Sequence, residues 1–519
     1  MKRATALALT AVLVSVPLAA CSKASTTSGG SAKTLVVDNA FDLKTIDPAR
    51  SFEFTGVFLD RQIYETVLTF AGKDVKTIKP GICSYSISPD AKTVTLTMDG
   101  THTFSDGTPV TADDIVFSLQ RVQGIAGNPS FLLDGVTVTK KDDKTVVLTS
   151  KTPNPQLPYI LPNPSLGIVN SKAVKAAGGG IDKNDNAEEA INKASVGSGP
   201  YMIESYDVQS KVVLKANPHF GGTKPAYGRV VVENVDAPTQ KVNVQAGSAQ
   251  LALNLGPDQV KDLDTSKTQV VPGESSTTIF LWFNMTPAFG ETVSNPTFVQ
   301  AMRQAIDYKA LLSIAGAGSK QPGGMVPVNF LGAVEADPAN STNQTKAKEL
   351  LAASGYKGEE INVLFSSDVA LGGVKLQNIA ETIQAQVKPL GINIKLNPQP
   401  SSTSLAAFRG GKQQAGLAYW GADYPDPADY LVFAPGQSLG KRAAWTPAAS
   451  PASDAAAKKA ADAIGEKARA EAYQAFQKQL NVDGPFIPLF QPASNLVAAS
   501  SLKNVVPNTI WTTELANIQ

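Results

Sequence analysis

A repeated order of helix, glycine and strand in the second half of the chain constrains the fold most. Each helical pattern carries apolar residues three and four positions apart, and each strand pattern alternates apolar and polar positions. The expected elements are helix 346–354, strand 361–365, helix 376–390 and strand 392–396. Gly355 and Gly391 directly follow the two helices, as is typical of a helix C-terminus. Helices that alternate with strands in this way indicate an α/β fold.

The first half is expected to contain mainly strands and turns with one clear helix. The strands are expected over residues 93–98 and 145–149. Thr111 and Asp114 form a capping-box pattern, which predicts that a helix begins between them. Further helices are expected after Asn295 and over residues 455–480.

The N-terminus has the three parts of an export signal. Lys2 and Arg3 precede an apolar stretch over residues 4–18, and small residues follow up to Cys21. The apolar stretch is shorter than the roughly 20 residues that cross a bilayer. Small residues directly before a cysteine resemble the lipobox of bacterial lipoproteins, which implies that residues 1–20 are removed and that Cys21 is lipidated. Two or more acyl chains would give a stable membrane anchor.

The segment that follows is a tether. Residues 21–33 begin with the expected lipidated cysteine and continue with serine, threonine and glycine, which form flexible linkers. Removal of Lys2 and Arg3 lowers the formal charge from +1 to −1, so neither nucleic acid nor an anionic surface is indicated as a partner. Beyond Cys21 the only cysteine is Cys83, so the mature chain has no intrachain disulfide. We interpret Cys83 as an apolar packing residue; a reactive thiol is the alternative.

Residues 104–121, with the sequence FSDGTPVTADDIVFSLQR, closely resemble the signature of the peptide and nickel class of extracellular solute-binding proteins. These proteins serve ATP-binding-cassette (ABC) importers. Other similar segments follow the family's order along the chain, at residues 46–49, 64–68, 197–201, 298–308 and 391–394. The resemblance spans most of the chain.

The resemblance implies a two-lobed periplasmic-binding-protein fold of the type II-like class, with an extra domain inserted in the first lobe. Chains of this length also divide into several domains. The expected boundaries are 34–55, 198–277 and 488–519 for the core of lobe 1, 56–197 for the inserted domain, and 278–487 for lobe 2. The lobes are expected to close on ligand by a hinge motion.

Residues 419–427, YWGADYPDP, resemble the stretch where peptide-binding members of the family hold their ligand. There the acid three positions after the tryptophan pairs with the α-amino group of the peptide, and Asp423 occupies this position after Trp420. The alternative is a loop aspartate before a turn, a role that fits Asp426 better. Trp420 is expected as a pocket wall or as core. The backbone of Tyr419, Trp420 and Gly421 is expected to hydrogen-bond an extended peptide as an added strand.

Two further groups of ligand-binding residues are expected from the resemblance. On the facing lobe, the backbone of Phe54, Thr55 and Gly56 is expected to contact the peptide. Asn284 follows the expected first crossing between lobes. It is expected to bond either the ligand or the backbone of the hinge.

An enzyme is not indicated, because His102 and His219 are the only histidines and neither lies in a catalytic or metal-binding motif. No cofactor or bound metal is expected. The predicted function is therefore a lipid-anchored, monomeric receptor that passes small peptides to an ABC permease. Its predicted location is the outer face of the cell membrane, or the periplasm where an outer membrane exists. The alternatives are a receptor for a metal chelate, a sugar or another small solute, and a surface adhesin or assembly protein that kept the fold.

Overall fold

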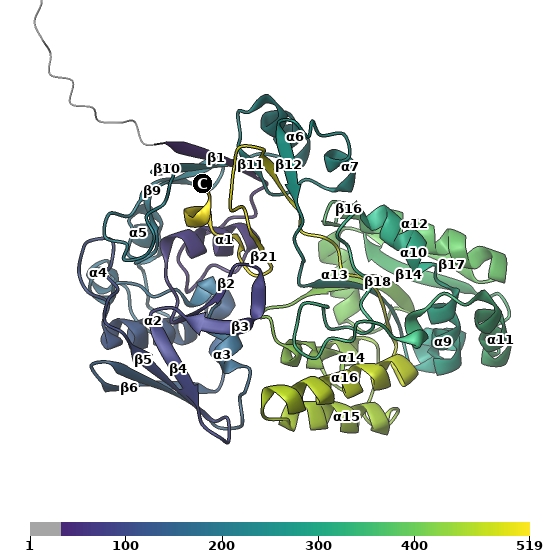
Figure 1. The fold of residues 1–519 in the computed structure, drawn as a ribbon. Coiled ribbons are helices and arrows are strands. Elements are labelled where there is room, and N and C mark those ends of the chain that lie inside the picture. The colour runs from purple at the N-terminus through teal and green to yellow at the C-terminus, as the bar shows by residue number, and fades with distance from the viewer. Residues whose placement is uncertain (1–32) are drawn as a thin grey trace, which may run out of the picture. The chain divides into compact units, whose positions relative to one another are not determined.

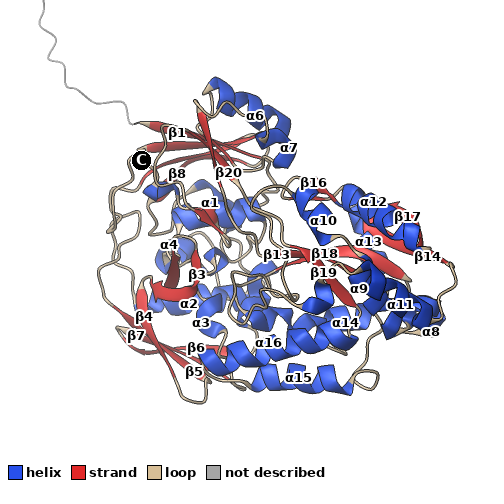
Figure 2. Cartoon of the chain, turned by 45° about the vertical axis from the view of Figure 1, so that its right-hand side comes forward, coloured by secondary structure: helices blue, strands red, loops and turns tan. Residues whose placement is uncertain are grey.

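The computed structural model describes residues 33–519, which form one compact unit. The expected export signal, the lipidation of Cys21 and the tether up to residue 32 lie outside these residues. Figures 1 and 2 show two groups of strands and helices, which we call lobe 1 and lobe 2. No helix of the described part is long and apolar enough to cross a membrane.

Lobe 1 is built on a seven-stranded sheet of order β12-β20-β11-β1-β10-β9-β8. Its strands are β1 (Thr34–Asn39), β8 (Tyr201–Asp207), β9 (Lys211–Ala216), β10 (Arg229–Asn234), β11 (Leu251–Ala252), β12 (Thr268–Val271) and β20 (Leu496–Ala499). β1 lies in the centre and pairs in parallel with both β10 and β11. The first and last parts of the chain therefore share one sheet.

Lobe 1 also contains a four-stranded antiparallel sheet of order β4-β5-β7-β6 with its own hydrophobic core. The strands are β4 (Cys83–Ile87), β5 (Thr93–Met98), β6 (Val136–Asp142) and β7 (Thr145–Ser150), beside the hairpins β2 (Leu68–Ala71) with β3 (Asp74–Pro80) and β21 (Pro507–Asn508) with β22 (Thr512–Thr513). The strands expected over residues 93–98 and 145–149 are confirmed. A separate inserted domain with the boundaries 56–197 stays a prediction.

Cys83 lies in the core of the four-stranded sheet. Its side chain is buried, and burial raises the pKa of its thiol to about 12. The interpretation as an apolar packing residue is thus confirmed, since so high a pKa leaves almost no thiolate at neutral pH.

The helices of lobe 1 are α1 (Phe54–Ile63), α2 (Ala112–Gly124), α3 (Leu157–Ile160), α4 (Ser171–Ala176), α5 (Glu188–Lys193), α6 (Ala237–Ala246) and α7 (Pro257–Val260), with the 3₁₀ turns η1 (Asn128–Leu133), η2 (Pro164–Leu166) and η7 (Leu515–Asn517). α2 begins as expected. Thr111 accepts a hydrogen bond from the backbone of Asp114, and the Asp114 carboxylate accepts one from the backbone of Thr111. This capping box satisfies two backbone N–H groups of the first turn.

Lobe 2 is built on a five-stranded sheet of order β17-β14-β18-β13-β19. Its strands are β13 (Thr277–Phe283), β14 (Glu360–Ser366), β17 (Asn393–Gln399), β18 (Ala415–Gly421) and β19 (Phe486–Phe490), with a small hairpin of β15 (Ala370–Leu371) and β16 (Val374–Lys375). β14 is parallel to β17 and β18, whereas β13 is antiparallel to β18 and β19. The α/β fold class is confirmed.

The helices of lobe 2 are α8 (Pro287–Gly290), α9 (Pro296–Ala305), α10 (Tyr308–Ala315), α11 (Gln344–Ser354), α12 (Leu376–Val387), α13 (Ser401–Arg409), α14 (Ser438–Arg442), α15 (Pro451–Asp462) and α16 (Glu466–Asp483), with η3 (Glu291–Ser294), η4 (Pro338–Asn340), η5 (Lys388–Leu390) and η6 (Pro427–Phe433). The helices expected after Asn295 and before Gly355 and Gly391 are confirmed. The single helix expected over residues 455–480 is wrong. It is split into α15 and α16 because Ala463 is extended, with a ψ of 133°, and Gly465 has a positive φ of 86°, so neither residue continues a helix.

Two connections join the sheets of the lobes, over residues 272–276 and 491–495. They run side by side, because Glu274 forms an antiparallel bridge with Ala493 and Ser494 donates its backbone N–H to Gly273 at 2.9 Å. Paired extended segments of this kind form a short double connection that can act as a hinge.

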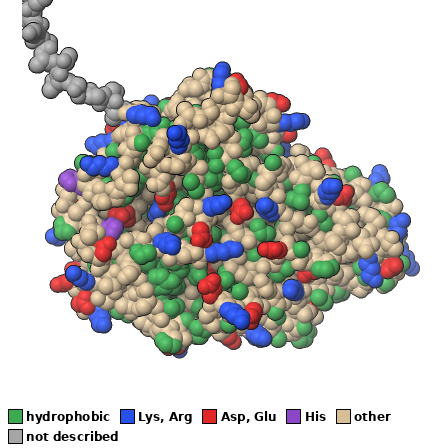
Figure 3. Space-filling view, in the orientation of Figure 1, with side chains coloured by type: hydrophobic (Ala, Val, Ile, Leu, Met, Phe, Trp, Pro, Cys, Tyr) green, Lys and Arg blue, Asp and Glu red, His purple; other side chains and the backbone are tan. Residues whose placement is uncertain are grey.

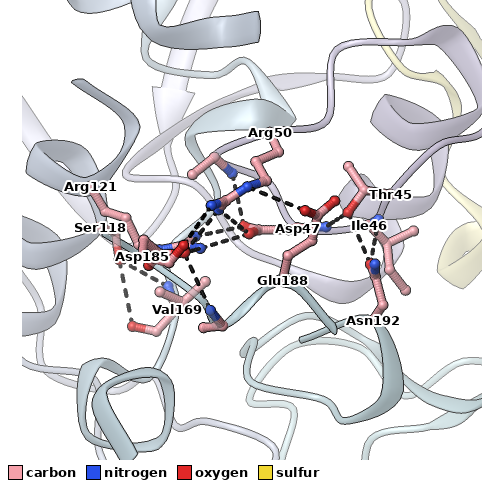
Figure 4. Close-up of polar contacts among 12 residues, drawn as sticks. Thr45, Ile46, Asp47, Arg50, Ser118, Arg121, Val169, Asp185, Glu188 and Asn192 are labelled. Carbon is pink, nitrogen blue, oxygen red and sulfur yellow. Dashed lines mark hydrogen bonds and ion pairs between the residues drawn. The ribbon is translucent and has the colours of Figure 1, made fainter. Parts of the chain in front are cut away.

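A buried ion cluster ties α2 to the chain that follows β1 (Figure 4). Arg121 donates two hydrogen bonds of 2.6 Å to Asp47 and bonds Asp185 at 2.8 and 2.9 Å, and Arg50 adds bonds to both acids. Burial opposes ionisation of Asp185, but the hydrogen bonds from Arg121 and from the backbone of Gly180 prevail and lower its pKa to about 2. Two family-like segments, 46–49 and 104–121, therefore meet in a structural clamp.

Candidate functional site

Trp420 and Asp423, the expected ligand-binding residues, lie at the end of strand β18 and just after it. β18 runs through the sheet of lobe 2 and ends at Gly421, and Asp423 follows two residues later. β13 pairs with β18 along its whole length, up to Gly421. The hydrophobic run at the start of β18 is buried, whereas Tyr419 and Trp420 at its end are exposed and partly exposed.

One edge of β18 is open beyond Gly416. On the side opposite β13, β14 pairs with β18 only at Ala415 and Gly416, and then continues beside β17. No other strand of residues 33–519 pairs with this edge. The backbone of residues 417–421 therefore offers hydrogen-bonding groups to an extended chain, as the sequence prediction for residues 419–421 requires.

A pocket of about 530 Å³ opens between this edge, β14 and α13. This volume lies within the roughly 300–1,000 Å³ of small-molecule sites. The pocket is lined by Trp282, Leu364, Phe365, Ser366, Leu376, Ser401, Ser402, Ser404, Leu405, Phe408, Arg409, Leu417, Ala418, Tyr419, Trp420, Gly421, Asp423 and Arg442. Four predicted site residues thus come together here: Tyr419, Trp420, Gly421 and Asp423.

A second, smaller pocket of about 140 Å³ shares Gly421 and Asp423 with the first and is lined on its other side by residues of lobe 1, including Phe54. Asn163 of lobe 1 donates its amide N–H to the backbone oxygen of Asp423 at 3.2 Å. Asp423 therefore lies where the two lobes meet.

The Asp423 carboxylate is partly buried and forms no hydrogen bond or ion pair with any described residue. Burial raises its pKa to about 6. A carboxylate with this pKa is mostly ionised at neutral pH. It has no ion-pair partner, although Arg409 and Arg442 line the same pocket, so a cationic group of a ligand could pair with it.

Asp429, which was not among the residues expected at the site, supports this arrangement. Its Oδ2 accepts the indole N–H of Trp420 at 3.1 Å and the backbone N–H of Asp423 at 3.2 Å. Burial, followed by the charge of Asp423, raises the pKa of Asp429 well above its usual value. The pKa values of both acids are thus above their usual values. At acidic pH the two carboxyl groups together therefore carry less than two full negative charges.

Asp426 has the turn role expected of it. It accepts the backbone N–H of Ala428 at 2.9 Å at the start of η6, and it pairs with Arg469 in the core. Both side chains are buried. Asp426 is therefore held by the protein's own groups through Oδ1, in contrast to Asp423, although its buried Oδ2 has no hydrogen-bond partner among the described residues.

Asn284 lies away from both pockets. Its side chain is completely buried and donates to the backbone oxygens of Gly411 and Gln413 at 3.0 and 2.9 Å, while its oxygen accepts the N–H of Thr286. Asn284 was expected to bond either the ligand or the backbone of the hinge. It does bond backbone atoms, but these belong to the loop before β18 and not to the hinge. Asn284 fixes this loop and has no free group for a ligand.

The expected contact of Phe54, Thr55 and Gly56 with ligand through an extended backbone is wrong. These residues form the first turn of α1, and Asp42 accepts the N–H groups of Phe54 and Thr55 at 3.1 and 2.9 Å. A helical turn has no strand edge to offer. The Phe54 side chain is nonetheless 82% exposed and lines the smaller pocket.

Neither histidine lies in the pocket of about 530 Å³. A hydrogen bond from His102 to Glu65 at 2.9 Å raises the pKa of the imidazole. Among residues 33–519 no three His, Cys, Asp or Glu side chains are grouped so that they could hold a metal ion.

Comparison with known proteins finds relatives along most of the chain. The family model named bacterial extracellular solute-binding proteins, family 5 Middle, matches residues 77–438. A relative named probable D,D-dipeptide-binding periplasmic protein DdpA from Escherichia coli is 25% identical over 487 residues, which cover 91% of either chain. The periplasmic oligopeptide-binding protein OppA from the same organism is also 25% identical, over 88% of this chain and 86% of the relative.

Solved structures share the fold. The ABC transporter substrate-binding protein CtaP from Listeria monocytogenes matches with a TM-score of 0.82 at 20% identity, covering 94% of this chain and 99% of the other. The ABC transporter-associated periplasmic binding protein DppA from Helicobacter pylori, solved in complex with the peptide STSA, matches with a TM-score of 0.73 at 21% identity, covering 93% of this chain and 97% of the other. The two-lobed fold expected from the sequence is confirmed.

Proposed function

Because the chain belongs to the bacterial extracellular solute-binding proteins of family 5, we propose that it is a receptor that captures short peptides and delivers them to an ABC importer. Relatives along nearly the whole chain are named dipeptide- and oligopeptide-binding proteins. Beyond membership of the family, the proposal specifies which class of ligand this chain binds and how the ligand is held.

The unpaired carboxylate of Asp423 carries the proposal. It lies in the larger pocket, at the junction of the lobes, and forms no ion pair with any described residue. The α-amino group of a peptide is a compact cation with three donors, and a charge-assisted hydrogen bond to it is worth about 1.5–3 kcal/mol. Asp423 would therefore fix the peptide's N-terminus.

The rest of the peptide would lie along the open edge of β18. Backbone hydrogen bonds with residues 417–421 recognise no side chain, so they suit a receptor of many peptides. Tyr419 and Trp420 would provide aromatic surface for the ligand's side chains.

Closure of the lobes would turn binding into a signal. Residues 272–276 and 491–495 form the double connection, and Tyr430 anchors it by donating its hydroxyl to the backbone of Ser276 at 2.8 Å. A peptide that touches both lobes binds the closed form more tightly, and this difference in affinity drives closure. The permease would then recognise the closed receptor.

The chain would work at the outer face of the cell membrane as a monomer, held by acyl chains on Cys21 and by the tether up to residue 33. Mass spectrometry of the protein from its native membrane tests the anchor. A mature N-terminus at Cys21 with attached acyl chains supports it, and an unmodified N-terminus elsewhere contradicts it.

Native mass spectrometry tests the function itself. Protein is compared as purified and after it has been unfolded and refolded to remove ligand. Co-purifying masses that match peptides, disappear on refolding and return with a peptide mixture would support the proposal. A protein that carries no such mass and ignores peptides would contradict it.

A further inference from the structure

Two tyrosines cross the junction of the lobes in opposite directions. Tyr424 of lobe 2, the residue after Asp423, packs against the core of the four-stranded sheet, a cluster whose other members all lie in lobe 1. Tyr159 of α3 in lobe 1 packs against the mainly lobe 2 cluster that contains Tyr473. Burial, followed by the charge of Asp426 in lobe 2, raises the pKa of Tyr159 to about 12, which agrees with this placement. Each lobe thus contacts an aromatic ring of the other.

A hydrogen bond joins the same two segments. Asn163 is buried, and its amide donates to the backbone oxygen of Asp423 at 3.2 Å. Its side-chain oxygen accepts the backbone N–H of Ser165 at 2.9 Å and so caps η2. Pro162 and Pro164 flank Asn163, and a following proline restricts the residue before it to extended backbone. The amide is therefore fixed in lobe 1 and directs its donor at lobe 2.

Both lobes therefore hold the segment that contains Asp423. Lobe 2 holds the backbone N–H of Asp423 through Asp429 at 3.2 Å, and lobe 1 holds its backbone oxygen through Asn163. Tyr159 and Tyr424 line neither the larger nor the smaller pocket, so they contact the other lobe and not the ligand site. Separation of the lobes would break the hydrogen bond and expose both rings to water, which costs free energy.

We propose that Asn163, Tyr159 and Tyr424 form a latch that holds the lobes closed over the N-terminus of the ligand. This inference rests on the proposed function and adds the residues that set how readily the receptor closes. Because the latch joins protein to protein, it stabilises the closed form by the same amount for every ligand. A weaker latch therefore lowers the affinity for all ligands by one factor and leaves the selectivity for an amino group unchanged.

The substitution Asn163→Ser tests the hydrogen bond alone. Serine is a good N-cap and can keep the bond to Ser165, but its side chain is too short to reach Asp423. Calorimetry on ligand-free mature protein compares Ala-Ala-Ala with N-acetyl-Ala-Ala-Ala. The variant is expected to bind both peptides about 3- to 10-fold more weakly than wild type, with the ratio of the two affinities unchanged. Unchanged affinities, or a loss confined to the free-amino peptide, overturn the latch.

The matched control is Asn170→Ser. Asn170 is also a buried N-cap in lobe 1, and its amide bonds Asp106 and Thr108 within that lobe. The control is expected to lower the melting temperature and to leave both affinities at their wild-type values. A loss of affinity in the control as large as that in Asn163→Ser overturns the latch, because it traces the effect to reduced stability.

The substitution Tyr424→Ala tests the packing contact. It is expected to weaken the binding of both peptides by about tenfold and to leave their ratio unchanged. Tyr206→Ala is its control, because Tyr206 is a partly buried tyrosine that packs against the core of its own lobe. Wild-type affinities in Tyr424→Ala, or an equal loss in the control, overturn the packing contact.

Failure of the proposed function remains distinguishable from failure of the latch. If wild type binds no peptide, the peptide receptor is contradicted, and the distance between the lobes in ligand-free protein decides the latch alone. Spin labels are attached at the exposed positions Lys151→Cys in lobe 1 and Lys467→Cys in lobe 2, while the buried Cys83 stays unlabelled. Asn163→Ser is expected to shift the distance distribution towards larger separations. Distributions that coincide in the two proteins overturn the latch.

Discussion

Trp420 donates its indole N–H to Oδ2 of Asp429 at 3.1 Å, and the same oxygen accepts the backbone N–H of Asp423 at 3.2 Å. One buried carboxyl group therefore orients both the aromatic wall and the acid of the pocket. On the face drawn in Figure 3, acidic and basic side chains are interspersed, without a large area of one sign. This face therefore carries no extended electrostatic field of one sign.

Affinity for peptides with a free amino group should depend on the ionisation of Asp423. Burial raises its pKa to about 6, and the ionised form is the one that pairs with an ammonium group. Affinity is therefore expected to be greatest near pH 7 and to fall about tenfold per pH unit below about pH 6; it should begin to fall again near pH 8, where the peptide's α-amino group loses its proton. Titration calorimetry from pH 4.5 to 8 measures this. Affinity that does not change across this range would contradict it.

Asp429→Asn should leave this pH dependence close to that of wild type. Burial raises the pKa of Asp423, whereas burial and then the charge of Asp423 raise the pKa of Asp429, so Asp429 is the acid that stays protonated while Asp423 ionises. The asparagine therefore replaces a neutral carboxyl group and keeps a side-chain oxygen for Trp420 and for the backbone of Asp423. A midpoint of the affinity profile that moves by a full pH unit in the variant would contradict this order of ionisation.

Arg121→Met should destabilise the protein strongly. It leaves Asp47 and Asp185 buried with only Arg50 to balance them. Removal of one partner from a buried ion pair costs about 3–5 kcal/mol. Urea denaturation measures the free energy of unfolding. Arg229→Met is the control, because its exposed pair with Glu204 contributes about 0–1 kcal/mol. Equal effects of the two substitutions would contradict the structural role of the clamp.

Asp60→Asn should remove a pH-dependent loss of stability. The Asp60 carboxyl group is completely buried, and burial, together with the charges of Asp47 and Glu53, raises its pKa well above the usual value. Between the unfolded pKa of about 4 and the raised folded pKa, the folded protein binds more protons at Asp60 than the unfolded chain. The stability of the folded protein therefore falls as the pH rises through this range. Melting temperatures of wild type and Asp60→Asn should agree near pH 4 and separate in favour of the variant towards pH 7.5. Parallel curves over this range would contradict the shift.

Local sequence rules predicted the elements that local contacts define. The capping box at Thr111, Asn295 before α9 and Gly355 after α11 all depend on neighbours within a few residues. The first turn of α1 was missed because Asp42, twelve residues before Phe54, accepts its N–H groups. The division between α15 and α16 depends on the backbone conformation of Gly465, which helical periodicity does not report.

The candidate site was predictable only where it lies in one segment. Tyr419, Trp420, Gly421 and Asp423 are neighbours in sequence and line one pocket. Arg409 and Arg442 line the same pocket but come from separate helices, so only the tertiary structure shows that they belong to it. Asp429 follows Asp426 by three residues, and only the burial of η6 distinguishes the two acids from surface residues.

The most direct test of the receptor's ligand recognition is calorimetric titration of ligand-free wild type and Asp423→Asn with Ala-Ala-Ala and N-acetyl-Ala-Ala-Ala at pH 7.5. Wild type is expected to bind the free-amino peptide about 10- to 100-fold more tightly than the acetylated one. Asp423→Asn is expected to bind both with the weaker affinity. Equal binding of the two peptides by wild type, or a preference that persists in Asp423→Asn, would contradict the role of Asp423 as the ammonium anchor.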